Sequence, residues 1–295
     1  MQRTELEIKI LSWQVLDNVP SASGIVISNE KFYAVGDNSP YLFQLNSNFE
    51  LLSKTSIYAS KKPVEDVIPK IDKPDFEAME MINDTEILIF GSGSKSPERD
   101  SCVLLKIGET STYTTYNMTP FYDQMRALEL MKGFELNIEA LAIKDGLLYL
   151  FNRGRNIIFS FSYNDFMTYC TTGTHFPIIK TNLVSLPKIN GLEAGFSGAT
   201  TTKDQPYLIF TASVEDSPNA YDDGPILGSF IGVIGFENGE ITNYLSAQQI
   251  PCPGFPLKIE SVTIEKQISE TETNLVVVTD NDGAPSEIIR LQMTL

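Results

Sequence analysis

The amino-acid sequence predicts an all-β fold, and within that class a five-bladed β-propeller closed by the N-terminal strand. Three observations lead to this prediction. Five segments repeat one pattern at intervals of about 60 residues, the last segment stops one strand short, and one strand at the start of the chain belongs to no segment. A repeat of this length with several short strands is typical of propeller blades.

Each repeat opens with Glu, or with Ser-Gly in the first case, and a small residue follows. A short alternating strand, a turn, a run of four or five large apolar residues and a polar cluster come next. The segments are SGIVISNEKFYAVGDNS, FEAMEMINDTEILIFGSGS, IEALAIKDGLLYLFNRGR, LEAGFSGATTTKDQPYLIFTASVED and IESVTIEKQISETETNLVVVTDND. The equivalent opening positions are Ser23 or Gly24, Glu77, Glu139, Glu193 and Glu260.

Turns and further strands complete each unit. Asp145-Gly146 is a strong signal for a tight hairpin between the first two strands of the third unit. A third strand follows each polar cluster, as in YLFQL and SCVLLKI, and a fourth follows in most units, as in STYTTYN. In the third unit we expect the fourth strand between Phe166 and Leu186.

The fifth unit ends after its third strand, at Leu295. The strand LEIKILSWQVL near the N-terminus would supply the missing fourth strand and remove both free sheet edges. Trp13 lies on this strand, and we expect it to pack between blades. The alternative is a sixth, degenerate blade within 59–75, 118–137 or 171–190.

Helix is expected at one place, in TPFYDQMRALELMKGF from Thr119 to Phe134. Tyr122, Met125, Leu128 and Met131 recur there at near-helical spacing. We interpret this segment as a surface helix packed on a blade rather than as a lid.

The chain is acidic, with 22 Lys and Arg against 38 Asp and Glu and a formal net charge of −16. Such a field repels nucleic acid and anionic membranes, so neither is expected as a partner, whereas cations are favoured. The first residues carry no continuous apolar stretch typical of a signal peptide. We therefore expect a single domain over residues 1–295, monomeric and cytoplasmic unless a leader was removed.

Several chemistries are disfavoured by what the sequence contains. The three cysteines, Cys102, Cys170 and Cys252, are widely spaced and form no CxxC pair, which argues against a disulfide framework or a thiolate zinc site. His175 is the sole histidine, and no G-x-S-x-G elbow is present, so a Ser-His-Asp triad is disfavoured. We expect His175 at the surface.

The opening acids are the main candidate site. In a propeller the innermost strand of each blade lines the central channel, so Glu77, Glu139, Glu193 and Glu260 are expected to converge. Carboxylates this close raise one another's pKa unless hydrogen bonds, arginines or a metal compensate them. Oxygen ligands suit Ca²⁺, with Mg²⁺ as an alternative. Blade-to-blade fastening and metal or ligand binding are both open interpretations of these acids.

Polar clusters between the second and third strands of each unit emerge at the same face. They include residues present in only one unit, which are better markers of function than the repeated glutamates. The candidate ligand-binding residues are Asn152, Arg153, Arg155, Asp37, Arg99 and Asp280. Asp222 and Asp223, in an insert of the fourth unit, are expected at the same end.

The repeat pattern resembles the phytase-like and esterase-like propellers, including the SdiA-regulated family. IEALAIKDGLLYLFNRGR and KIESVTIEK with NLVVVTDND carry the resemblance best. It implies a propeller fold, and for some members calcium binding or hydrolysis of phosphate or carboxylic esters. The openings here are Glu-Ala or Glu-Ser rather than the Glu-Gly-Pro of lactonase-like propellers, and no long acidic segment of the calcium-dependent phytases is present.

Two functions follow as hypotheses. The first is a non-catalytic propeller that binds a small molecule or a protein at the channel face. The second is a metal-dependent ester hydrolase, in which Ca²⁺ polarises a phosphoryl or acyl oxygen and Arg153 or Arg155 anchors the anionic group.

Overall fold

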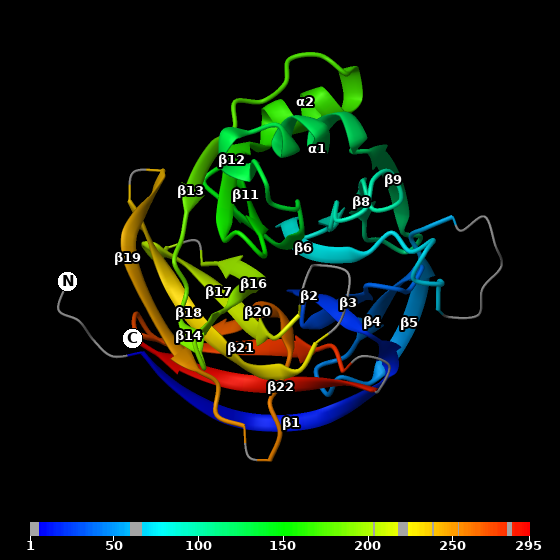
Figure 1. The fold of residues 1–295 in the computed structure, drawn as a ribbon. Helices are drawn as coiled ribbons and strands as arrows, with labels where there is room; N and C mark the ends of the chain where they lie inside the picture. Colours follow the sequence, from blue (N-terminus) through cyan, green and yellow to red (C-terminus); the bar gives the residue numbers. More distant parts are fainter. Residues whose placement is uncertain are drawn as a thin grey trace.

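The computed structural model describes residues 6–59, 67–202, 204–217, 224–237, 239–252, 254–281 and 285–295. Five antiparallel four-stranded sheets are arranged around a central axis, as Figure 1 shows. This arrangement confirms the five-bladed propeller.

Each blade uses four strands, and the first strand of each is innermost. Blade one comprises β2 (Ala22–Ser28), β3 (Lys31–Gly36), β4 (Tyr41–Leu45) and β5 (Leu51–Ser56), and blade two comprises β6 (Phe76–Asn83), β7 (Glu86–Gly91), β8 (Ser101–Lys106) and β9 (Thr112–Asn117). Blade three comprises β10 (Ile138–Lys144), β11 (Leu147–Asn152), β12 (Ile157–Ser162) and β13 (Lys180–Leu183), and blade four comprises β16 (Gly195–Thr201), β17 (Tyr207–Glu215), β18 (Ile226–Glu237) and β19 (Glu240–Gln249).

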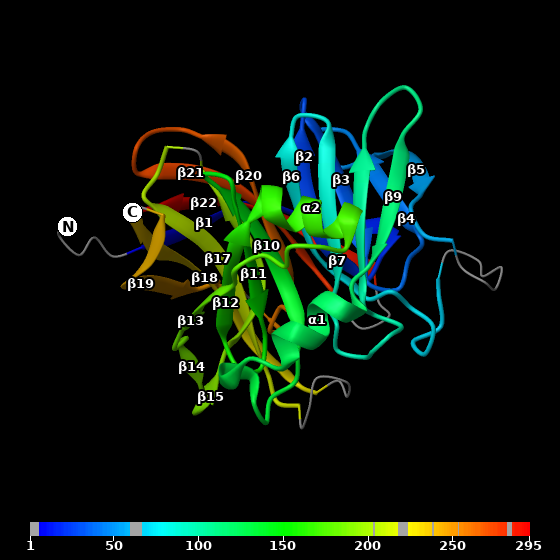
Figure 2. The same cartoon turned by 90° about the horizontal axis from the view of Figure 1, so that it is seen from above.

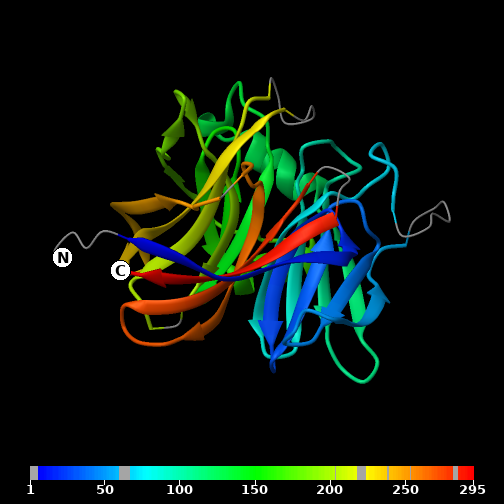
Figure 3. The ribbon, with the colours of Figure 1, turned by 90° about the horizontal axis from the view of Figure 1, so that it is seen from below.

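Blade five is closed by the two ends of the described chain. It comprises β20 (Ile259–Gln267), β21 (Glu272–Thr279), β22 (Pro285–Thr294) and β1 (Glu7–Pro20), and β1 pairs antiparallel with β22 from Glu7 opposite Thr294 to Pro20 opposite Pro285. Figure 3 shows the two strands side by side. Trp13 packs against the apolar cluster shared by blades four and five, as predicted. The pairing covers an edge that would otherwise invite association.

A β-bulge recurs near the start of every innermost strand. The bulged residue is Ser23 in β2, Glu77 in β6, Glu139 in β10, Ser197 in β16 and Glu260 in β20. A bulge re-aims the extra side chain away from the regular pleat. The repeat therefore places three glutamates and two serines at equivalent positions.

The predicted equivalence of Glu193 is wrong. Glu193 lies in β15 (Leu192–Glu193), which pairs only with β14 (Lys188–Ile189) outside the blades, and its side chain is exposed. Its carboxylate accepts a hydrogen bond from the backbone N–H of Leu186 at 2.8 Å. The bulged position of blade four is held by Ser197, four residues further on.

Helices fill the gap between blades two and three, as Figure 2 shows. α1 (Thr119–Arg126) and η1 (Glu129–Met131) occupy the predicted helical segment, which is interrupted after Arg126. α2 (Tyr163–Thr172) was not predicted. Phe121 and Phe166 from the two helices join an apolar cluster with residues of both blades, so the predicted packing of a helix on a blade is confirmed.

The alternative of a sixth blade is wrong over the described part of the chain. Its candidate segments hold the helix α1, the outer strand β13 and the short β14, and no further four-stranded sheet is formed. The fourth strand of blade three is β13, within the range expected. Over the same residues, no helix has the length and apolar character needed to cross a membrane.

Candidate functional site

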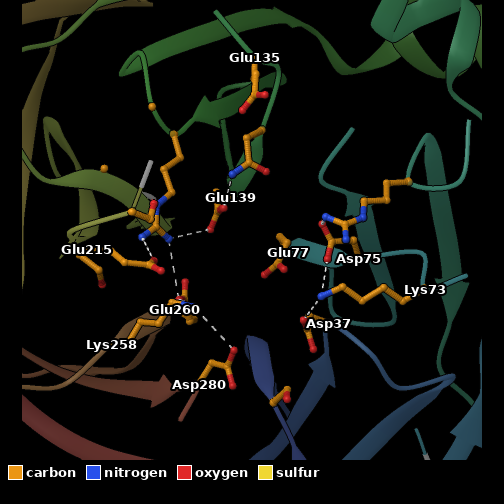
Figure 4. A pocket seen from close by; sticks show the side chains of 18 of the residues that line it. Asp37, Lys73, Asp75, Glu77, Glu135, Glu139, Glu215, Lys258, Glu260 and Asp280 are labelled. Atoms are coloured by element: carbon orange, nitrogen blue, oxygen red, sulfur yellow. Dashed lines mark hydrogen bonds and ion pairs between the residues drawn. The ribbon is translucent and has the colours of Figure 1, made fainter. Parts of the chain in front are cut away.

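A cavity of about 820 Å³ opens at the end of the channel where the innermost strands begin. Its wall includes the bulged residues Glu77, Glu139 and Glu260, the loops that lead into the innermost strands, and the polar clusters that follow the second strands. This size is ordinary for a small-molecule site. Figure 4 shows acidic side chains from different blades around one central space, among them Glu77, Glu139 and Glu260.

The wall is dominated by charge. Nine of its residues are Asp or Glu and six are Lys or Arg, which leaves a formal excess of three negative charges if all are ionised. The acids come from every blade because each blade sends either its bulged residue or a loop to this end of the channel.

Lys73 neutralises the side of the cavity formed by blades one and two. Its ammonium lies between the carboxylates of Asp37 and Asp75 and is 2.7 Å from Asp75 Oδ1. Arg99 Nη1 donates to Asp75 Oδ2, also at 2.7 Å, and the Arg99 side chain is buried. These ion pairs are largely removed from water, so each charge depends strongly on its partners.

Arg153 neutralises the opposite side and connects three blades. Its guanidinium lies 3.4 Å from Glu139 of its own blade, 2.9 Å from Glu215 of blade four and 3.9 Å from Glu260 of blade five. Lys258, just before β20, lies 3.2 Å from Glu260 and 3.8 Å from Asp280. The side chains of this group therefore fasten blades as well as line a cavity.

Three buried carboxylate oxygens of the wall accept no hydrogen bond within the described structure, Asp37 Oδ1 and both oxygens of Glu260. Of these, Glu260 Oε1 is in an ion pair with Lys258 at 3.2 Å, whereas Glu260 Oε2 is in none. The Glu260 side chain is only 3% exposed. For Glu77, neither a hydrogen bond nor an ion pair is present to any described residue. Burying a carboxylate without donors is costly, so these oxygens are positions where a bound donor would be favoured.

Burial raises the pKa of the channel carboxyls. The pKa of Glu77 is held well above its ordinary value by burial and then by the nearby Asp75 and Glu139. Burial raises the pKa of Glu260 to about 7, although Lys258 opposes the shift, and raises that of Asp37 to about 6 against the effect of Lys73. The pKa of Glu139 is also raised by burial, with Arg153 opposing.

The pKa values of two lysines in the wall are raised, although burial alone would lower them. Burial lowers the pKa of Lys73, but Asp75 and Asp37 outweigh it and the net pKa is raised. The pKa of Lys258 is raised by Glu260 and Asp280 in the same way. Both ammonium groups therefore stay charged at neutral pH.

Most of the candidate residues do line the cavity. Asp37, Arg99, Arg153, Arg155 and Asp280 are part of its wall, together with Glu77, Glu139 and Glu260. Arg155 stacks on the ring of Phe134, with its guanidinium carbon 4.4 Å from the ring centre. Glu193 reaches only the rim, as an exposed side chain. Asp222 and Asp223 lie outside the described residues.

Asn152 does not face the cavity. It is fully buried, and its Oδ1 accepts from the backbone N–H of Asn137 at 2.7 Å. Its Nδ2 donates to the carbonyls of Arg153 and Arg155 at 2.8 and 3.1 Å. The amide shapes the loop that carries these arginines, so its contribution to the site is indirect.

Among the charged residues of the wall that were not predicted are Lys73, Asp75 and Lys258. Each lies immediately before an innermost strand, within four residues of the bulged glutamate of blade two or five. Their position in the sequence could have identified them, because the loop that leads into an innermost strand lies at the channel face.

Three carboxylates at one side of the cavity are of the ligand type that hard cations prefer. Oxygens of Asp37, Asp75 and Glu77 lie within 4.8 Å of one another, and carboxylates are the ligands that Ca²⁺ and Mg²⁺ prefer. The ammonium of Lys73 already lies between two of the three carboxylates. A metal ion would have to compete with this lysine.

Comparisons with known proteins identify the fold. The solved structure of a glutaminyl cyclase from Myxococcus xanthus is similar with a TM-score of 0.54 at 9% sequence identity, over 98% of this chain and 97% of that one. A calcium-binding protein, regucalcin, from Agrobacterium tumefaciens gives a TM-score of 0.44 at 9% identity, over 96% and 95% of the two chains. At such identities the likeness concerns the fold alone.

No curated protein matches the sequence. The propeller part of the predicted resemblance is supported by the fold, whereas a closer likeness to the phytase-like group is not shown. Residues 18–293 match the model of a family described as "Family of unknown function (DUF6929)", and the chain belongs to that family.

Proposed function

We propose that the protein is a binding module that holds a small polar ligand in the channel cavity. The observation that carries this proposal is that buried carboxylate oxygens of Asp37 and Glu260 accept no hydrogen bond from described residues and belong to the wall of one cavity. A purely structural cluster gains nothing by leaving buried acceptors unpaired. A ligand that donates hydrogen bonds satisfies them.

The test is a ligand screen by thermal shift, with binding measured by titration calorimetry. Compounds that bind in the cavity should raise the melting temperature of the wild type, and they should bind at least tenfold more weakly to Glu260→Gln. The matched control is Glu270→Gln, an exposed glutamate of the hairpin at the opposite end of blade five. If no compound raises the melting temperature, or if every hit binds both variants equally, the cavity is not the binding site.

A calcium-dependent ester hydrolase is the second candidate, as the resemblance to phytase-like and esterase-like propellers suggests. The cluster of Asp37, Asp75 and Glu77 favours it. When bound there, Ca²⁺ would act as a Lewis acid on a phosphoryl or acyl oxygen, and Arg153 or Arg155 would hold the anionic group. Melting with EDTA and then with added Ca²⁺ separates the candidates, because an unchanged melting temperature removes the metal and with it the hydrolase.

Partners of the protein stay predictions from its charge. With a net charge of −16, we expect it to avoid nucleic acid and anionic membranes. A monomer in the cytoplasm, unless a leader was removed, stays a prediction from the sequence. A protein ligand at the channel face remains an alternative to a small molecule.

A further inference from the structure

We propose that the ligand of the channel cavity is an organic primary ammonium attached to an apolar group. This inference rests on the proposed function and names the chemical class of its ligand. It depends on the charge of the wall, the hydrogen bonds that the wall lacks, and the character of the cavity mouth.

The charge of the wall selects a cation. If all are ionised, acidic side chains of the wall exceed basic ones by three, and the whole chain is strongly acidic. A bound cation favours the ionised form of those carboxyls whose pKa burial raises. Two central bases of the wall are already paired, because the ammonium of Lys73 is engaged with Asp37 and Asp75, and Arg153 with three glutamates. An anionic ligand would have to break these pairs, whereas a cation adds to them.

The missing hydrogen bonds select a cation with several N–H groups. Glu260 is almost fully buried, and its Oε2 accepts no hydrogen bond from a described residue. Asp37 Oδ1 is buried and accepts none either. Glu77 projects toward the same space in Figure 4. An ammonium offers three donors in a tetrahedral arrangement, enough to serve carboxylates that approach from several blades.

Two lysine side chains of the protein already place an ammonium between two carboxylates of the cavity. The ammonium of Lys73 is placed between Asp37 and Asp75, and that of Lys258 between Glu260 and Asp280. The Glu77 carboxyl, by contrast, forms no ion pair within 4.0 Å with a described residue, and the charge of Lys73 acts on it only from a longer distance. A ligand ammonium would complete the pattern at this third position, and it is small enough to do so without displacing either lysine.

Two exposed apolar side chains belong to the wall of the cavity. Phe134 is 51% exposed and Val67 is 45% exposed, and both belong to the wall, next to the buried Ile68. Exposed aromatic and aliphatic side chains beside a charged cavity fit a ligand whose charged end enters first and whose apolar body rests at the entrance. A free inorganic cation makes no use of these residues.

The experiment measures binding of hexylamine, as its ammonium ion at pH 7, by titration calorimetry. Hexanol tests the need for charge, hexanoate the sign of the charge, and hexyltrimethylammonium the need for N–H donors. We expect hexylammonium to bind at least tenfold more tightly than each of the other three. Methylammonium, which lacks the apolar body, should also bind at least tenfold more weakly.

Variants test the location. Glu77→Gln keeps the shape of the side chain and should weaken hexylammonium at least tenfold, and Phe134→Ala should weaken it several-fold while leaving methylammonium unchanged. Glu270→Gln, an exposed change in the hairpin at the opposite end of blade five, is the control and should bind within twofold of the wild type. A tripeptide with a free N-terminal leucine, compared with its acetylated form, distinguishes a peptide amine from a small alkylamine as the source.

Each outcome is decisive. If hexanol, hexanoate or hexyltrimethylammonium binds as tightly as hexylammonium, or if Glu77→Gln binds it normally, the ammonium assignment is overturned. If no amine or amino-terminal peptide binds but an uncharged polyol does so in a Glu260-dependent way, this inference fails and the proposed binding function stands. If nothing binds in the cavity at all, both fail together.

Discussion

Glu80 of blade two accepts a hydrogen bond at 3.1 Å from the hydroxyl of Thr200 in blade four. The two blades are not neighbours, so this bond crosses the channel, three residues deeper along β6 than Glu77. It links opposite walls below the cavity. Burial raises the pKa of Glu80 to about 7, and the hydrogen bonds from Met81 N–H and from Thr200 only partly oppose the shift.

This relationship predicts a pH-dependent stability. The pKa of Glu80 is higher in the folded protein than in the unfolded chain, so the folded state binds more protons between about pH 4.5 and 7. Its contribution to stability is therefore present at low pH and is lost as pH rises through about 7. Glu80→Gln should raise the free energy of unfolding at pH 8 by about 1 to 3 kcal/mol, with little gain at pH 4.5.

Urea unfolding of the wild type and Glu80→Gln at the two pH values measures this effect. Glu270→Gln, an exposed change, should alter stability by less than about 0.5 kcal/mol at either pH. A Glu80→Gln variant that is less stable than the wild type at pH 8 would show that the charged carboxylate is the favoured form.

The position of Arg153 predicts how much stability the protein loses when a cation shared by three carboxylates is removed. Arg153→Met leaves Glu139, Glu215 and Glu260 buried without their common cation. Breaking a buried ion pair on one side costs about 3 to 5 kcal/mol, so the melting temperature should fall sharply at pH 8. The loss should be smaller at pH 5, because the orphaned glutamates then bind protons.

Arg155→Met is the matched control for this prediction. Arg155 stacks on the half-exposed Phe134, and its loss should cost about 1 kcal/mol or less. Thermal unfolding of both variants at pH 5 and 8 gives the comparison. Equal losses at the two pH values would argue that Arg153 acts by packing rather than by charge.

The position of Lys73 predicts that its ammonium lowers the affinity of the acidic cluster for a metal ion. Its ammonium lies between the carboxylates of Asp37 and Asp75, two of the three members of the acidic cluster. Lys73→Met should therefore raise the affinity for Ca²⁺ at least tenfold, because the metal no longer competes with the lysine. Calorimetric titration with CaCl₂ measures it.

Lys95→Met serves as the control, since Lys95 pairs with Glu98 outside the cluster, at 3.9 Å. It should leave Ca²⁺ affinity unchanged. Calcium binding that is equal in the wild type and Lys73→Met would place the ion elsewhere or show that Lys73 does not compete with it.

The fold was largely predictable because propeller blades repeat. Strand alternation, the Asp145-Gly146 turn and the missing fourth strand of the last repeat each had a local sequence signal. Asp145 and Gly146 both adopt positive φ, as the tight hairpin requires. α2 gave no such signal, because its packing depends on an apolar surface made by two blades.

The candidate site was predictable only in part. Glu193 was misplaced because Leu-Glu-Ala mimics the opening of the other repeats, whereas the true counterpart, Ser197-Gly198, repeats the Ser23-Gly24 of the first blade. Lys73 and Lys258 were missed since single lysines before a strand carry no motif. Their role appears only when the ring brings them beside acids from other blades.

Asn152 separates a ligand role from a structural one. Its amide accepts from Asn137 N–H and donates to two carbonyls of the arginine loop, and it is buried away from the cavity. Asn152→Ala leaves these backbone groups without partners, which should cost about 2 to 4 kcal/mol in urea unfolding. The affinity of the folded fraction for hexylammonium should stay within threefold of the wild type.

Asn156 offers the matched comparison, because its amide also bridges backbone groups, donating to Ala194 O at 2.8 Å and accepting from Phe196 N–H at 3.2 Å. Asn156→Ala should destabilise by a similar amount, since the chemistry lost is the same. If Asn152→Ala instead kept full stability and lost ligand binding, the amide would have to reach the ligand. That result would restore the direct role predicted for this residue, which ends β11.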